Sequence, residues 1–103
     1  MDYKTILTNA ANDDLLAVVK YIAQDNANEA LKFHDRIIDA LQNLSMFPRM
    51  GSEPKNKLLQ VENYRKLTLG NYIAWYKIDD VNKRVNIIRF LHGAMKQEEH
   101  LLQ

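Results

Sequence analysis

The stretch YRKLTLGNYIAWYKIDDVNKRVNIIRFLH, residues 64–92, decides how the rest of the chain must be arranged. Gly70-Asn71 separates its first two apolar runs, and this pair suits a tight hairpin because glycine accepts a positive φ and asparagine tolerates it. A longer polar connection, residues 79–83, separates the second run from the third. The three runs, rich in β-branched and aromatic residues, are Tyr64–Leu69, Tyr72–Ile78 and Val85–Leu91. They predict an antiparallel meander of three strands.

The third run is the best candidate for a central strand. Its apolar residues occur on both parities, with Val85, Ile87 and Leu91 on one and Ile88 and Phe90 on the other. A strand that is covered on both faces has this composition. The run also carries Arg89 and ends at His92. A charged side chain on a central strand needs a structural or chemical reason, so these two residues are candidate functional residues.

The residues before this stretch predict one more strand and a pair of helices. Tyr3–Thr8 could supply a fourth strand, and from Asn9 the apolar residues recur at positions 15, 18, 19 and 22. This spacing predicts a helix that ends near Gln24 and is capped by Asn9 or Asn12. Asn26 and Glu29 have the spacing of a capping box and open a second helix, whose apolar face continues to residue 44. Helices joined so closely must be antiparallel, and the sheet is the only other large apolar surface on which they can pack.

Two segments have weaker patterns. Residues 45–62 contain Pro48, Gly51 and Pro54, which end the second helix. Lys55–Val61 then fits either a short helical turn or an irregular segment. Gly93 ends the last strand, and Ala94–Gln103 fits either a terminal helix or a frayed tail.

The composition is that of one soluble globular domain. The chain has 103 residues, of which 47% are hydrophobic and 26% are charged, which suffices for one core. It has no cysteine, and its three histidines lack a short metal-ligand spacing, so we expect no disulfide, no metal and no cofactor. No apolar run approaches the length of a membrane helix, and the N-terminus lacks a secretion signal, so we expect a cytoplasmic location. The net charge is only +1, but the bases concentrate after residue 44, which favours an acidic partner.

The order strand, helix, helix, strand, strand, strand resembles the RelE/ParE superfamily of bacterial toxins, which belong to type II toxin–antitoxin modules. The order and spacing of several short pieces carry the resemblance: Asp14-Leu15, Ala30 with Phe33, Leu44 with Pro48 and Gly51, Tyr64-Arg65, Gly70-Asn71-Tyr72, Trp75-Tyr76, and Phe90-Leu91-His92-Gly93. The resemblance implies a small α+β domain, in which an antiparallel sheet of about four strands packs one face against the N-terminal helical hairpin. The other face, with the C-terminal segment, is then left for a target or an antitoxin.

One branch of this superfamily cleaves messenger RNA on the ribosome. Cleavage of a phosphodiester needs groups that transfer protons and cations that hold the developing negative charge, roles that suit histidine and arginine. The resemblance to this branch assigns catalytic roles to Arg65, Arg89 and His92. Two features oppose this assignment. Residues 93–97 contain no tyrosine and one base, and a net charge of +1 is low for a protein that settles on ribosomal RNA.

The ParE branch resembles the chain at least as well. Its members inhibit DNA gyrase by binding and need no acid–base pair, so this branch is slightly preferred. The target-binding residues are then Lys66, Met95 and Lys96, on the open face of the sheet and in the C-terminal region. Alternatively, Met95 only helps to close the core. Both branches imply a cognate antitoxin as partner, and a third hypothesis is a degenerate member kept as a non-toxic binding subunit. The sequence does not define the oligomeric state.

Overall fold

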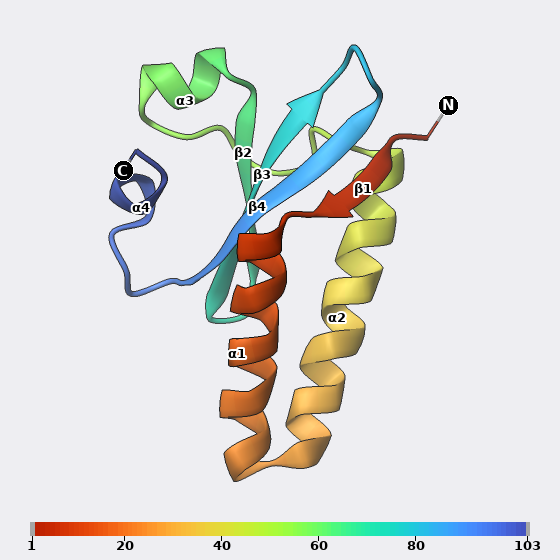
Figure 1. Cartoon of the computed structure of the whole chain (residues 1–103), viewed down its shortest axis with the longest axis vertical. Coiled ribbons are helices and arrows are strands. Elements are labelled where there is room, and N and C mark those ends of the chain that lie inside the picture. Colours follow the sequence, from red (N-terminus) through yellow and green to blue (C-terminus); the bar gives the residue numbers. More distant parts are fainter. Residues whose placement is uncertain (1, 103) are drawn as a thin grey trace.

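The computed structural model describes residues 2–102, which contain one mixed sheet of four strands (Figure 1). The strands are β1 (Lys4–Leu7), β2 (Tyr64–Leu69), β3 (Tyr72–Asp79) and β4 (Arg84–His92). Their order across the sheet is β1-β4-β3-β2. The α+β class, the three-strand meander and the central place of β4 are therefore confirmed. Gly70 has a φ of 61°, which is the positive value that its turn requires.

The pairing of β1 differs from the expected, wholly antiparallel sheet. β1 runs parallel to β4, with Lys4 opposite Arg84 and Leu7 opposite Ile87. The cause is the helical hairpin, which returns the chain to the end of the sheet where β1 begins: the Tyr3 N–H donates to the Ser45 carbonyl at 2.9 Å. β2 therefore starts in the same direction as β1, and β4, two antiparallel strands later, runs in that direction again.

The hairpin consists of α1 (Asn9–Asp25) and α2 (Ala27–Met46). Thr8 caps α1, since its Oγ1 accepts the Ala11 N–H at 3.2 Å, so the prediction of Asn9 or Asn12 as the cap was wrong. The sequence pattern assigned Thr8 to the strand run, which hid its second role. Asn26 caps α2 as predicted, by accepting from the N–H groups of Asn28 and Glu29.

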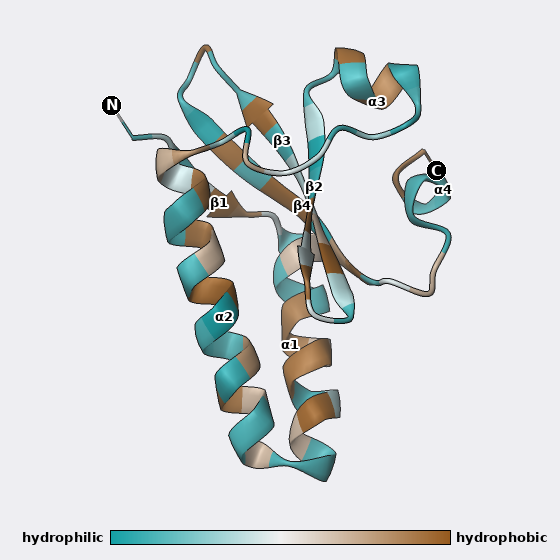
Figure 2. Cartoon of the chain, turned by 180° about the vertical axis from the view of Figure 1, so that it is seen from behind, coloured by the Kyte–Doolittle hydropathy of each residue, from teal (hydrophilic) through white to brown (hydrophobic). Residues whose placement is uncertain are grey.

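The main core lies between this hairpin and one face of the sheet, and hydrophobic and hydrophilic residues alternate along the helices and strands accordingly (Figure 2). A bulge sets which side chains of β4 reach this core. Tyr76 pairs with Ile87, but the preceding residue, Trp75, pairs with Arg89, so Ile88 is an extra residue. The bulge brings Phe90 to the same side as Ile87 and into the core, although strict alternation had predicted the opposite side.

The two remaining helices, α3 (Lys57–Val61) and α4 (Gln97–Leu101), are short and lie on the side of the sheet away from α2 (Figure 1). They decide the two alternatives left open by the sequence in favour of helix. Trp75 points away from the main core, yet it is 0% exposed, so the second face of the sheet is partly covered. Within residues 2–102, none of the helices combines the length and the apolar character needed to span a membrane.

A polar cluster ties β1 to the loop after α2 and to the β3–β4 turn. Asp80 accepts from the Tyr3 hydroxyl at 2.5 Å and from both Nη atoms of Arg49, at 3.3 and 2.6 Å. The bonds to Arg49 and then to Tyr3 lower the pKa of the Asp80 carboxyl below its ordinary value of 3.8. This carboxylate therefore contributes stability above the ordinary pKa, and the contribution is lost as the pH falls through the lowered one.

We expect Asp80→Asn to reduce the loss of unfolding free energy between pH 6 and pH 3. The change is below about 1 kcal/mol, because both side chains of the ion pair are about half exposed to solvent. Urea unfolding at the two pH values measures it. Asp39→Asn, which removes an exposed carboxylate on α2, is the matched control. Equal pH dependence in the two variants would contradict this role for Asp80.

Candidate functional site

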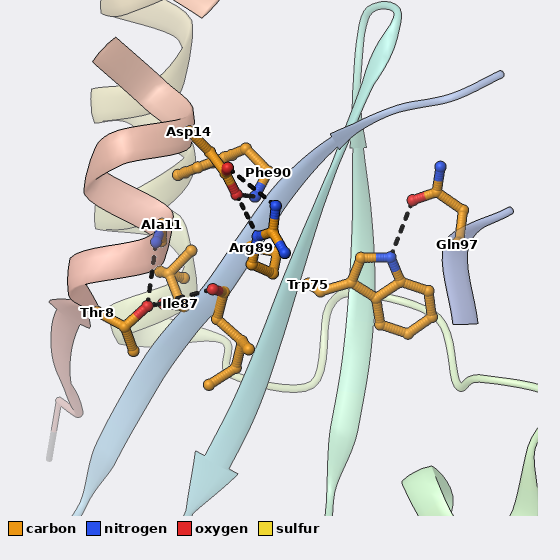
Figure 3. Close-up of polar contacts among 9 residues, drawn as sticks. Thr8, Ala11, Asp14, Trp75, Ile87, Arg89, Phe90 and Gln97 are labelled. Carbon is orange, nitrogen blue, oxygen red and sulfur yellow. Dashed lines mark hydrogen bonds and ion pairs between the residues drawn. The ribbon is translucent and has the colours of Figure 1, made fainter. Parts of the chain in front are cut away.

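The edge of β4 beyond β1 holds the first predicted catalytic residue. β1 ends opposite Ile87, so the following residues of β4 have no strand beside them on that edge. Asp14 of α1 takes the place of a strand partner, because its Oδ2 accepts the Phe90 N–H at 3.0 Å (Figure 3). The same carboxylate binds Arg89 twice, Nε at 2.6 Å and Nη2 at 3.1 Å. The Arg89 guanidinium is thus engaged by an intramolecular carboxylate.

Thr8 satisfies the adjoining backbone of the bulge. Its Oγ1 donates to the carbonyl oxygens of Ile87 at 2.9 Å and Ile88 at 3.2 Å. Thr8 and Asp14 together fix the start of α1 against β4.

Arg65 lies at the start of β2 and holds the loop that follows α2. Its Nη1 donates to the carbonyl oxygens of Gly51 at 2.7 Å and Arg49 at 3.3 Å. Its Nη2 lies 3.6 Å from a carboxylate oxygen of Glu53. Tyr76 completes this arrangement, since its buried hydroxyl accepts the Gly51 N–H at 2.9 Å. Burial raises the pKa of the Tyr76 phenol, which keeps it neutral and available to the loop.

His92 is exposed at the end of β4. Its Nδ1 accepts the Ala94 N–H at 3.1 Å, so the proton of the neutral ring is on Nε2. The ring packs edge-on against Tyr72, with 5.2 Å between ring centroids.

The structure does not bring the three predicted catalytic residues together. Arg65 pairs with Tyr76 and His92 pairs with Tyr72, so these two positions are about 13 Å apart along the strands and roughly 10 Å across them. Arg89 pairs with Trp75 and therefore starts on the opposite face of the sheet. Their assigned catalytic roles stay predictions.

The predicted target-binding residues lie closer to one another in the fold. The Nζ of Lys66 is 5.8 Å from the ring centroid of Trp75, a cation–π distance. The Trp75 Nε1–H donates to Gln97 Oε1 at 3.0 Å, and Gln97 directly follows Lys96 (Figure 3). Met95 is 40% exposed. Trp75 thus links the three residues, whose role in target binding is still a prediction.

Two side chains that sequence reasoning missed hold the C-terminal segment in place. Gln97 Nε2 donates to the carbonyl oxygens of His92 at 2.7 Å and Met95 at 3.1 Å. The Glu98 carboxylate accepts from the backbone N–H groups of Lys55 at 2.9 Å and Asn56 at 2.8 Å. The sequence signal for either residue is weak, because a glutamine and a glutamate in a polar tail are ordinarily solvated.

Two solved structures have the same fold. One is the chromosomal ParDE toxin–antitoxin system from P. aeruginosa, with a TM-score of 0.67 and 22% identity over 87% of this chain and 95% of that chain. The other is the toxin–antitoxin complex RelBE2 from Mycobacterium tuberculosis, with a TM-score of 0.61 and 22% identity over 89% of this chain and 99% of that chain. A comparison with curated proteins gives no match.

The mixed sheet and helical hairpin therefore define a RelE/ParE-type toxin fold. Residues 5–97 match the family model of the ParE toxin of the type II toxin–antitoxin system parDE. The chain belongs to this family. The predicted superfamily is confirmed.

Proposed function

We propose that this toxin arrests growth in the cytoplasm by binding DNA gyrase, and that its cognate antitoxin blocks this contact. One observation carries the preference for binding over RNA cleavage. Both candidate catalytic arginines are held by other groups of the fold, Arg65 by loop carbonyls and Arg89 by Asp14, and His92 is remote from Arg65. General acid–base cleavage needs such groups converging within hydrogen-bond reach of one phosphate. Membership of the ParE family supports the same preference.

The proposed gyrase contact is the surface formed by Lys66, Met95 and Lys96. Gln97 and Glu98 fix this surface to the fold, so the exposed side chains before them are presented in a defined arrangement. A side chain presented in this way loses less conformational entropy on binding than one on a free tail.

The test is inhibition of supercoiling by purified gyrase, with wild-type toxin and the double variant Met95→Glu/Lys96→Glu. We expect at least a tenfold loss of inhibition in the variant, because it removes an apolar contact and reverses a charge at the surface. Lys83→Glu is the control, since Lys83 is exposed in the β3–β4 turn at the far end of the sheet. Equal inhibition by the wild type and the double variant would exclude this contact surface.

Pulse labelling of protein and DNA synthesis after induction separates this proposal from its alternatives. If DNA synthesis stops first, the target is gyrase. If translation stops first and His92→Ala or Arg89→Ala removes toxicity, the protein is a messenger RNA endonuclease. Co-purification with the antitoxin without any growth arrest would identify a non-toxic binding subunit.

A further inference from the structure

The helical hairpin is longer than the sheet on which it packs, and its connected end extends beyond the β2–β3 turn (Figures 1 and 2). A groove of about 650 Å³ lies between this projecting end and the turn. Its walls include Tyr21 and Ile22 of α1, Phe33 and Arg36 of α2, and Tyr72 and His92 at the ends of their strands. The volume lies within the range of about 300–1,000 Å³ that is usual for binding sites.

Three rings form a continuous row along the groove. Phe33 and Tyr72 meet edge-on with 5.4 Å between centroids, and Tyr72 meets His92 in the same way at 5.2 Å. Tyr21, on the α1 wall, is 61% exposed. The toxin's own fold leaves this aromatic surface uncovered, and apolar side chains of a partner would bury it favourably.

Charges stand at the two ends of the groove. Arg36 lies at the sheet end, where its Nη1 fills the space that a Cβ would take at Gly70. Within residues 2–102 it forms no ion pair, whereas Lys32, also on this wall, is bound by Glu29 at 3.3 Å. Asp25 lies at the opposite end, about 15 Å away along α2 by helix rise. The groove is thus complementary to a short peptide with an apolar anchor and a carboxylate directed towards Gly70.

We propose that this groove docks a segment of the cognate antitoxin, which places an apolar side chain on the Phe33–Tyr72–His92 row and a carboxylate at Arg36. The proposal rests on the proposed function for the identity of the partner. Continuity favours the antitoxin over the target. His92 lines the groove, and its carbonyl also accepts from Gln97, which fixes the C-terminal segment. A segment in the groove therefore adjoins the proposed gyrase contact, where an inhibitor of that contact must act.

The test is calorimetric titration of the full-length toxin with purified cognate antitoxin. We expect Arg36→Glu and Tyr21→Glu each to weaken binding at least tenfold. Lys20→Glu and Leu31→Glu are the matched controls, because they make the same changes on exposed helix positions outside the groove and should stay within twofold of the wild type. Wild-type affinity in both groove variants would overturn the proposal.

Two further readouts keep the result unambiguous. Gyrase inhibition by the groove variants in the absence of antitoxin is expected to be unchanged, and its loss with antitoxin affinity retained would assign the groove to the target instead. If the wild type does not inhibit gyrase at all, the proposed function fails, while the antitoxin titration still decides the groove. Should a variant fail to fold, the NMR shifts of Tyr72 and His92 in wild-type toxin decide: they move on antitoxin addition if the proposal holds.

Discussion

Replacing Asp14 with alanine is expected to lower the free energy of unfolding by about 2–3 kcal/mol, because one carboxylate makes three hydrogen bonds between α1 and the edge of β4. The bond to the Phe90 N–H matters most. That group lies where β1 no longer covers the sheet, and without Asp14 it loses its partner in the folded state. Arg89 loses less, since its side chain is 32% exposed and can recover contacts with water.

Urea unfolding of three variants separates these contributions. Asp14→Asn keeps an acceptor for the Phe90 N–H and is expected to cost about 1 kcal/mol less than Asp14→Ala. Asp13→Ala removes a neighbouring, exposed carboxylate of the same helix end and should change stability by no more than about 0.5 kcal/mol. If Asp14→Ala and Asp13→Ala were equally stable, the carboxylate would not be the edge partner described above.

Gly51→Ala is expected to cost about 2–3 kcal/mol by overpacking a site that has no room for a methyl group. An added Cβ would lie 2.6 Å from the Lys66 carbonyl oxygen and 2.6 Å from the Tyr76 hydroxyl. Movement of the loop away from this clash would also strain the two hydrogen bonds between Ser52 and Lys66, at 2.9 and 3.0 Å. The position needs glycine for close approach, and its φ is not in the left-handed region.

The double variant Gly51→Ala/Tyr76→Phe tests which contact dominates, with thermal or urea unfolding as the measurement. Removal of the hydroxyl relieves one contact only, so the double variant is expected to remain at least as unstable as Gly51→Ala. Ser52→Ala, at the next and exposed position, is the control and should be nearly neutral. Recovery of wild-type stability in the double variant would contradict the role of the Lys66 carbonyl.

Much of the fold could be predicted because local patterns and packing requirements agree along this chain. The Gly70-Asn71 pair and the runs on either side specify the β2–β3 hairpin without help from other parts of the chain. Asn26 specifies the start of α2 in the same way. The Phe90 side of β4 could not be predicted, because a bulge depends on the partner strand and leaves no mark in the run itself.

The candidate site was less predictable, for a related reason. The sequence drew attention to Arg89 as a charge on an apolar strand, but its partner Asp14 is 75 residues away and meets it only because β1 is short. Arg65 likewise has carbonyl partners in a loop whose course the sequence does not define. Contacts of this kind depend on where elements end, which periodicity locates least well.

The parallel pairing of β1 with β4 has a consequence for synthesis. β4 lies between β1 and β3 and also packs on α1, yet it is the last strand to leave the ribosome. Until residues 84–92 are available, β1 has no neighbour and the apolar stripes of the hairpin face an incomplete sheet. Such long-range pairing forms late, because the loop between its strands must close first. A nascent or truncated chain therefore cannot display the toxin's surfaces, which come into existence together when the full chain folds.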